Sequence, residues 1–543
     1  MPKTTSLAVQ SISQQARRHT FFFHLNAIQC LAGSFFVAKK LQRYAMDNIY
    51  QEKYQKEHVA SFPIEEKKIG YTTASPGTLQ NLRTTARKVI RASDVKVPEG
   101  YTVEPVMTGL SLPTDLAFAP DGTLFVSEGG SSWPTRPYMP ARIIRVKTNG
   151  EVDAIQMDIQ AGPRGIAYKD GELYMAIKGG YFTRIVKYNL ETKKLTMLID
   201  QLPNGGWHEP GGPVFGPDGL MYFGQGSVSQ QGVVLPQGFT VDIAKHPLAH
   251  DIPGQDITLT GNNCWSRDPI APYPYMVETG GFKPFKTPAK KGEQIKGELF
   301  CSSGVWRSKP DGTDVELLAW GIRNPFGMAI NNEGDLYVAD NDFEEKSARA
   351  IAEDPDRIWH LKIAKQPYGS IKTPDWYGFP DICGDGLPVN HESHIPLKGE
   401  PALPIIENPP QWAGPAAYLE KPHSCMCKMD FCTSDAFGFK GELFATEWGT
   451  LAPLNTPRKE ALTHGFKVIR LNTQTGKAED FFTNHQPGPA SYFGTGGLER
   501  PVSCKFHPDG KSLFVLDFGT VRVTTGYMLA FAHTGVIWKI TKQ

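Results

Sequence analysis

An alternating pattern of apolar and polar residues recurs six times along the chain, each time directly after a turn. Three of the copies are PDGTLFVSEGG at 120–130, GPDGLMYFGQGS at 216–227 and HPDGKSLFVLDFGT at 507–520; the others lie at 169–180, 332–342 and 439–450. A turn containing Asp-Gly or a similar pair, followed by an alternating stretch, is typical of a β-hairpin with a half-buried strand. Six copies of one pattern predict six units of the same local structure.

A second regularity precedes the turns. Four prolines stand eight residues before the turn acid or its equivalent, with a short apolar strand between: Pro113, Pro210, Pro325 and Pro501. The turn glycines Gly122, Gly171 and Gly219 are 49 and 48 residues apart, which fits one four-stranded blade per repeat. Later repeats are longer, and we expect their extra residues in long loops on one face.

The repeats therefore predict an all-β fold, a six-bladed β-propeller over residues 96–543. Ring closure favours this reading over a series of β-sandwiches or two separate domains, because a closed ring leaves few exposed sheet edges.

Residues 1–95 differ from the repeats, and we predict a mainly helical N-terminal extension there. Arg17 and Arg18 precede an apolar run at 21–38, which is about the length needed to cross a bilayer. This run is a candidate membrane anchor, and the candidate tether suggests an extracytoplasmic location, in the periplasm or at the cell surface. Polar residues such as His24 and Asn26 interrupt the run, so a helix docked on the main domain and an unstructured leader are the alternatives.

Composition and charge exclude some function classes. The chain has 57 basic and 56 acidic residues and a formal charge of +1, which gives no long-range attraction for nucleic acid. Its eight cysteines show no repeated spacing and no haem-attachment motif. Cys425, Cys427 and Cys432 lack the paired spacing of zinc sites, so we expect ordinary buried thiols.

The start of the innermost strand of each blade faces the central tunnel of a propeller. The equivalent positions here hold cationic and imidazole side chains together with one amide: Arg164, His208, Arg323, Asn324, His423 and Arg500. Arginines that converge without a partner repel one another, so the set predicts an anionic ligand with several carboxylates. The alternative is that each arginine pairs with a nearby acid, such as Glu209 or Glu499.

Two further features suggest catalysis and metal binding. His208 could accept the hydroxyl proton when a sugar alcohol or hemiacetal is oxidised, because an imidazole titrates near neutral pH. The acidic run from Asp340 to Asp356 offers clustered oxygen ligands of the kind that bind Ca²⁺. A solvated acidic loop is the alternative for that run.

Several segments resemble a known family. WHEPGGPVFGPDGLMYFGQGS, WGIRNPFGMAINNEGDLYVADND and WYGFPD are similar to blade signatures of the quinoprotein glucose and sorbosone dehydrogenases, and the similarity runs from about residue 98 to the C-terminus. The resemblance implies a propeller that holds pyrroloquinoline quinone (PQQ) over Ca²⁺ at the tunnel mouth.

The resemblance also suggests roles for single residues. It implies His208 as the base and Arg323 with Asn324 at the quinone, and we add Arg164, Arg500 and His423 as candidate cofactor ligands. Calcium is expected near the backbone of Asp342 and Phe343, with Asp340 beside them.

The chain departs from the glucose dehydrogenases at one informative place. It has Gly226-Ser227 where those enzymes have Gly-Asp, so the pattern is closer to the sorbosone and pyranose dehydrogenase branch. We therefore expect a PQQ-dependent oxidoreductase that acts on an aldose or related polyol and passes electrons to an unidentified external acceptor. A Ca²⁺-dependent lactonase-type hydrolase and a non-catalytic scaffold remain alternatives.

Overall fold

The computed structural model describes residues 67–68, 88–128, 135–136, 141–156, 162–179, 182–204, 206, 208–235, 243, 246–269, 271–525 and 528–543. The chain divides into two units, 1–63 and 64–543, and the description below concerns the second. The candidate anchor at 21–38 and most of the predicted helical extension lie outside the described residues. Within the described part of the chain, no helix has the length and hydropathy needed to cross a membrane.

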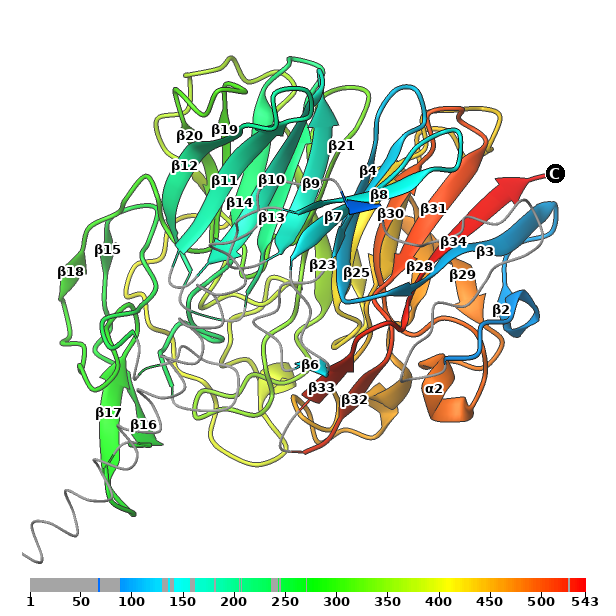
Figure 1. Ribbon diagram of the computed structural model, residues 1–543. Coiled ribbons are helices and arrows are strands. Elements are labelled where there is room, and N and C mark those ends of the chain that lie inside the picture. The colour runs from blue at the N-terminus through cyan, green and yellow to red at the C-terminus, as the bar shows by residue number, and fades with distance from the viewer. Residues whose placement is uncertain are drawn as a thin grey trace, which may run out of the picture. The chain divides into compact units, whose positions relative to one another are not determined.

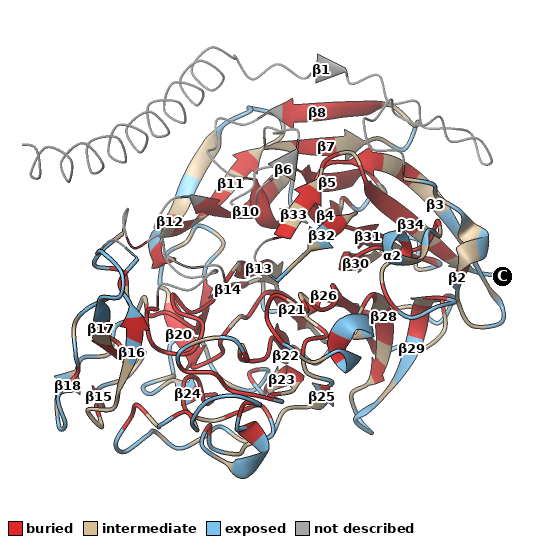
Figure 2. Ribbon diagram, turned by 90° about the horizontal axis from the view of Figure 1, so that it is seen from below, coloured by how far each residue is buried: buried red, intermediate tan, exposed pale blue. Residues whose placement is uncertain are grey.

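Six of the sheets in the described part of the second unit are blades of four antiparallel strands, some with a short strand added at the outer edge (Figures 1 and 2). From the innermost strand outward, blade 1 contains β4 (Pro113–Phe118), β5 (Leu124–Glu128), β7 (Arg142–Val146) and β8 (Val152–Gln156); blade 2 contains β9 (Pro163–Lys169), β10 (Glu172–Gly179), β11 (Phe182–Asn189) and β12 (Leu195–Pro203). Blade 3 contains β13 (Pro210–Phe215), β14 (Met221–Gln225), β19 (Gly304–Ser308) and β20 (Glu316–Trp320); blade 4 contains β21 (Gly327–Ile330), β22 (Leu336–Asp340), β23 (Asp356–Leu361) and β25 (Tyr418–Glu420). Blade 5 contains β26 (Met426–Phe431), β27 (Leu443–Glu447), β28 (Lys467–Asn472) and β29 (Lys477–Asn484); blade 6 contains β30 (Pro501–Phe506), β31 (Ser512–Asp517), β34 (Gly535–Lys542) and β3 (Tyr101–Leu110).

The innermost strands form a closed ring. Contacts run from β4 to β9, β13, β21, β26, β30 and back to β4, and these strands surround the centre of Figure 2. Each predicted turn-and-strand repeat is the first hairpin of one blade, and all six turn glycines have positive φ, between 68° and 93°. The predicted six-bladed propeller is confirmed.

The ring is closed by strands from opposite ends of the chain. β3, near the start of the propeller, pairs with β34 at the C-terminus, with Tyr101 opposite Lys542 and Leu110 opposite Gly535. A second N-terminal strand, β2 (Val95–Lys96), pairs with β29 at the outer edge of blade 5. The start of the propeller therefore holds the last two blades together.

Close packing of the inner strands requires glycine at three positions. A Cβ atom on Gly165, Gly211 or Gly327 would lie 1.6, 1.7 or 2.0 Å from a backbone carbonyl oxygen of the next blade. Such contacts are far inside van der Waals distance. These glycines let neighbouring blades approach closely around the tunnel.

Two long insertions interrupt the regular blades. Residues 226–303 separate β14 from β19 and carry β15 (Ile257–Thr258), β16 (Asn263–Arg267), β17 (Met276–Gly280) and β18 (Gln294–Ile295); residues 362–417 separate β23 from β25. The insertions pair with each other through a bridge between Leu259 and Ile406. The buried guanidinium of Arg349 binds the carboxylate of Asp381 at 2.7 Å and the carbonyl of Gln231 at 2.7 Å, which ties both insertions to the loop after β22.

Candidate active site

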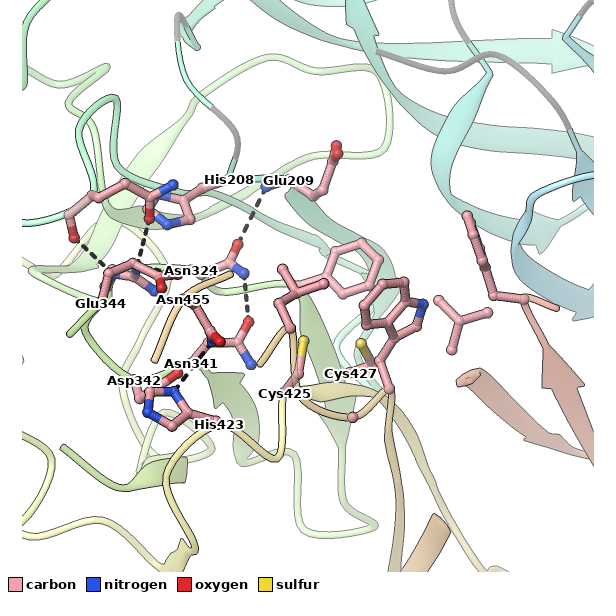
Figure 3. Close-up of a pocket in the computed structure, with 18 of the residues that line it drawn as sticks. His208, Glu209, Asn324, Asn341, Asp342, Glu344, His423, Cys425, Cys427 and Asn455 are labelled. Atoms are coloured by element: carbon pink, nitrogen blue, oxygen red, sulfur yellow. Dashed lines mark hydrogen bonds and ion pairs between the residues drawn. The ribbon is translucent and has the colours of Figure 1, made fainter. Parts of the chain in front are cut away.

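A cavity of about 150 Å³ lies where the inner strands begin. All six blades contribute to its lining. The residues from the inner strands and the segments directly before them are Thr114, Arg164, His208, Glu209, Arg323, Asn324, Phe326, His423, Cys425, Cys427 and Val502. Segments that follow the second strands add Gln230, Asn341, Asp342, Glu344, Trp448, Gly449, Leu451, Asn455 and Phe518. Figure 3 shows how the labelled side chains surround this space.

The imidazole of His208 is buried, with 5% of the residue exposed. Its Nδ1 atom lies 2.7 Å from Oγ and 3.0 Å from the carbonyl oxygen of Ser227. Nε2 on the other side of the ring is buried and has no hydrogen bond among the described residues. Burial and the positive charge of Arg323 hold the pKa of His208 well below its usual value, so the ring is neutral at neutral pH.

The hydrogen bonds of Ser227 also fix which nitrogen of His208 carries the proton. The Ser227 hydroxyl donates to the carbonyl of Ser229 at 2.6 Å, so its oxygen is left as an acceptor for Nδ1–H. The Ser227 carbonyl is also an acceptor. The neutral ring therefore carries its proton on Nδ1, and Nε2 keeps its lone pair.

Arg164 and Glu209 form an ion pair at the cavity wall. Arg164 Nε lies 2.9 Å from Glu209 Oε2, and both side chains are largely buried. Lys178 lies 3.9 Å from the other carboxylate oxygen and donates to the carbonyl of Gly206 at 2.7 Å. Burial lowers the pKa of Lys178 to about 8. Glu209 therefore neutralises a cation that the sequence suggested was free for a ligand.

Arg323 is held by the segment that follows β14. Its Nε and Nη2 atoms donate to the backbone and side-chain oxygens of Gln230 at 2.9 and 2.6 Å. Glu344 lies 3.7 Å from the same guanidinium. Burial raises the pKa of Glu344, and the charge of Arg323 offsets part of that effect. The neighbouring Asn324 amide donates to Asn341 at 2.6 Å.

His423 forms a third charged pair, with Asp342. The distance from Nδ1 to the carboxylate oxygen is 2.5 Å, and both side chains are buried. Burial opposes the imidazolium, but the charge and hydrogen bond of Asp342 outweigh it and raise the pKa of His423 to about 9. His423 is therefore a cation at neutral pH. Its Nε2 atom is buried without a hydrogen bond among the described residues.

Arg500 is not among the cavity-lining residues. Its guanidinium donates to the carbonyls of Gly449 and Thr450 at 3.0 and 3.1 Å and stacks 4.0 Å from the ring of Trp448. Arg500 thus stabilises the loop after β27 without lining the cavity. The expectation that three arginines meet at one opening holds for Arg164 and Arg323 and not for Arg500, and the two that meet have carboxylate neighbours.

The carboxylates among the predicted calcium ligands have other partners. Asp340 accepts hydrogen bonds from the backbone of Asn324 at 2.7 Å and from Arg357 and Trp359 at 3.1 Å. Phe343 donates its backbone N–H to Asp354 at 2.8 Å, and its ring is buried. Asp342 lines the cavity in the ion pair with His423.

The carboxylates of this loop are not gathered into a metal site. In the part of the chain that the structure describes, no group of three or more histidine, cysteine or acidic side chains is arranged to hold a metal. Much of the acidic run instead anchors buried cations, as when Arg357 Nη1 binds Asp354 at 2.6 Å.

Several residues of the site, in the cavity wall or directly behind it, were not predicted from the sequence. Ser227 was noted only because the glucose dehydrogenases have aspartate at that position, whereas in the structure its two oxygens orient His208. Glu344 and Asn455 reach the cavity from loops after second strands, where the repeat pattern ends. Trp448 directly follows the repeated strand ELFATE. An aromatic residue directly after a repeated strand is the sequence feature that could have indicated a place in the cavity wall.

No protein-family model matches the chain, and no curated protein matches it. Among solved structures, a Trichoderma reesei protein of the carbohydrate-active enzyme family AA12, determined with iodide, is 13% identical, with 86% of this chain and 100% of that chain covered and a TM-score of 0.50. The holo form of the PQQ domain of pyranose dehydrogenase from Coprinopsis cinerea is 15% identical, with 86% and 99% covered and a TM-score of 0.49. The PQQ-bound aldose sugar dehydrogenase from Streptomyces coelicolor is 14% identical, with 82% and 99% covered and a TM-score of 0.44.

These comparisons establish the fold that the chain shares with the T. reesei protein. PQQ-dependent sugar dehydrogenases, the group that the sequence motifs resemble, are represented among the solved structures found. Function has to be argued from the cavity itself.

Proposed function

We propose that this protein is a sugar oxidoreductase that removes a hydride from an alcohol or hemiacetal carbon and uses PQQ as the hydride acceptor. The observation that carries the proposal is the state of His208: neutral, oriented through Nδ1, with a buried Nε2 lone pair at the cavity. A proton acceptor of this kind is what oxidation of a hydroxyl group requires. The motif resemblance gives the same assignment, and the T. reesei structures of the same fold are described as carbohydrate-active.

His208 accepts the hydroxyl proton at Nε2 in this proposal. The ring then becomes an imidazolium, with Nδ1–H still donating to Ser227. Among the residues that the structure describes, Nδ1 has only Ser227 oxygens and no carboxylate as partner to stabilise that charge, and nearby Arg323 destabilises it. Protonated His208 therefore readily releases its proton again, which suits a base that must be regenerated in every turnover.

The cavity lining fits PQQ in two respects. Phe326, Trp448 and Phe518 provide apolar aromatic surface for a planar ring system. His208 and His423 each leave a buried ring nitrogen without a hydrogen bond among the described residues, which a polar ligand in the cavity would satisfy. When bound, PQQ supplies an ortho-quinone that accepts two electrons from the substrate.

The charges around the cavity nearly balance before any ligand binds. Arg164, Arg323 and His423 each have a carboxylate neighbour, and Lys178 adds one more cation. The raised pKa of Glu344 lets that side chain take up a proton when an anion enters. Arg323 and His423 are then the cations that would hold the carboxylates of the cofactor.

The hydrolase alternative gains one observation from the structure. Glu209, Asp342 and Glu344 line the cavity, and carboxylates are the ligands that a calcium-dependent lactonase would use. Each of these carboxylates, however, lies within 4 Å of a cation. The oxidoreductase therefore accounts better for the neutral His208 and for the aromatic wall.

The proposal is tested by adding PQQ to the full-length protein, with and without Ca²⁺, and following quinone absorbance and dye reduction with a panel of aldoses. We expect saturable PQQ binding and sugar-dependent dye reduction. The His208→Asn variant should bind PQQ with affinity within a few-fold of the wild type and lose dye reduction. Hydrolysis of sugar lactones with Ca²⁺ and no dye reduction would overturn the proposal in favour of the hydrolase.

A further inference from the structure

Two cysteines stand side by side in the wall of the cavity. Cys425 and Cys427 both line it, and Figure 3 shows both side chains directed toward the same part of it. Cys425 is half-buried, and Cys427 is 4% exposed. Neither residue has a part in the proposed oxidation of a sugar.

The backbone brings the two sulfur atoms together. Met426, which separates the two cysteines, is the first residue of β26, so their Cα atoms are about 6.6 Å apart. This spacing lies within the range of about 4.4–6.8 Å found for disulfides. Cys425 directly precedes β26 and has φ of 56°, and the pairing of β26 with β27 shifts register between Met426 and Met429. The neighbouring Cys427 thiol and burial raise the pKa of Cys425 well above its usual value. Cys425 is therefore a neutral thiol with the Cys427 side chain beside it.

The other cysteines of the described chain differ in their surroundings. Cys301, Cys383, Cys432 and Cys504 are fully buried, and none of them lines the cavity. Cys264 is half-buried in the first insertion and also lies outside the cavity lining. Only the pair in β26 and the segment before it combines a neighbouring thiol with access to the cavity, as far as the described residues go.

We propose that Cys425 and Cys427 form a redox-convertible dithiol, which low-molecular-weight disulfides or diazene oxidants that enter the cavity convert to an intramolecular disulfide. Cys425 is the more exposed thiol, so an oxidant reaches its sulfur first. The thiol loses its proton as the bond to the oxidant forms, and the raised pKa of Cys425 makes this step slow at neutral pH. Cys427 then displaces the bound oxidant fragment from Cys425.

The electrons and protons of this conversion balance. Cys425 and Cys427 together lose two electrons and two protons as the S–S bond forms. With a disulfide oxidant, the oxidant's own S–S bond breaks and leaves as two thiols. With a diazene such as diamide, the N=N bond takes up both electrons and both protons and becomes a hydrazine. No metal ion and no cofactor takes part, so the conversion does not depend on the proposed function.

The test uses the full-length reduced protein, treated in its native state with diamide. The protein is then denatured, free thiols are blocked with N-ethylmaleimide, and tryptic peptides are weighed. The peptide Gly399–Lys428 contains both cysteines, since Lys421 precedes proline and resists trypsin, whereas Cys432 falls on Met429–Lys440. We expect the first peptide to lose both maleimide groups and the mass of two hydrogens, and dithiothreitol to restore it, while the second peptide keeps its maleimide group.

Single variants provide the matched controls. In Cys427→Ser, Cys425 should form a mixed disulfide when glutathione disulfide is the oxidant, and the wild type should resolve that adduct to the internal disulfide. In Cys425→Ser, the buried Cys427 should stay reduced. Two results would overturn the proposal: both maleimide groups remaining on the native wild-type peptide, or Cys427 cross-linked to Cys432 instead of Cys425.

Discussion

Ser227 offers a direct test of the assigned base, because its side chain contacts Nδ1 of His208 on the side away from the unbonded Nε2. Replacing Ser227 by alanine removes the hydroxyl oxygen 2.7 Å from Nδ1 and leaves the carbonyl oxygen at 3.0 Å. The preferred tautomer therefore survives, but the ring loses one of its two acceptors.

The size of the effect follows from the energy of one hydrogen bond. A neutral hydrogen bond contributes about 0.5–1.5 kcal/mol, and about 1.4 kcal/mol corresponds to a tenfold change in rate. We expect kcat of Ser227→Ala to fall about 2- to 12-fold with little change in KM. His208→Asn removes the base itself and should lower kcat about 10²- to 10⁴-fold.

The decisive measurement is the double variant. Steady-state dye reduction by the PQQ-loaded protein gives kcat and KM for the wild type, both single variants and the pair. Ser227 acts only through the imidazole in our account, so Ser227→Ala should change nothing once His208 is asparagine. Ser266→Ala is the matched control, since its hydroxyl is also buried but has no hydrogen bond among the described residues. Multiplicative losses in the pair, or full kcat in His208→Asn, would refute the assignment.

Three further predictions concern pH and stability. Because burial and Arg323 depress the pKa of His208, kcat/KM should fall below pH 6.5 and stay level from pH 6.5 until His423 loses its proton, near its pKa of about 9. The thermal midpoint should also fall below pH 6.5, where the unfolded chain takes up the proton that the folded state resists. An acid limb centred above pH 6.5 would contradict the low pKa of His208. Arg500→Lys loses hydrogen bonds to carbonyls and the stacking on Trp448. We expect the free energy of unfolding to fall by about 1.5–3 kcal/mol, which lowers Tm by roughly 2–3 °C for a domain of this size, as measured by calorimetry. Gly211→Ala places a Cβ 1.7 Å from a carbonyl oxygen and should lower Tm strongly. Gly171→Ala is the control and should lower Tm much less, because no atom lies within 4 Å of the new Cβ and only the positive φ is unfavourable. Equal Tm values for the two variants would show that close packing of the blades does not require glycine at 211.

Much of the fold was predictable because each repeat is a local structure. The Asp-Gly turns and the alternating strands placed six hairpins correctly, and these hairpins begin the six blades. The pairing of β3 with β34 was not predicted. It joins residues more than four hundred positions apart, and neither strand carries a turn or spacing signal that identifies its partner.

The candidate site was predictable in position but not in its charges. The sequence indicated correctly that Arg164, His208, Arg323 and His423 stand at the starts of inner strands and face one cavity. The sequence also placed Arg500 at the cavity, whereas in the structure its guanidinium binds the carbonyls of a neighbouring loop. Calcium binding was expected from the acidic run, but buried cations and backbone N–H groups occupy much of it.

The sequence by itself determined where turns and strands begin, because those signals lie within about a dozen neighbouring residues and depend on backbone preference and alternation. Only the tertiary structure decided which charge meets which, because the loop after β22 brings Glu344 to Arg323 of its own blade and Asp342 to His423 of the next blade. The tertiary structure also decided the protonation state of His208. Its low pKa and single free nitrogen come from burial and from a serine nineteen residues away, and neither can be read from the residues next to it.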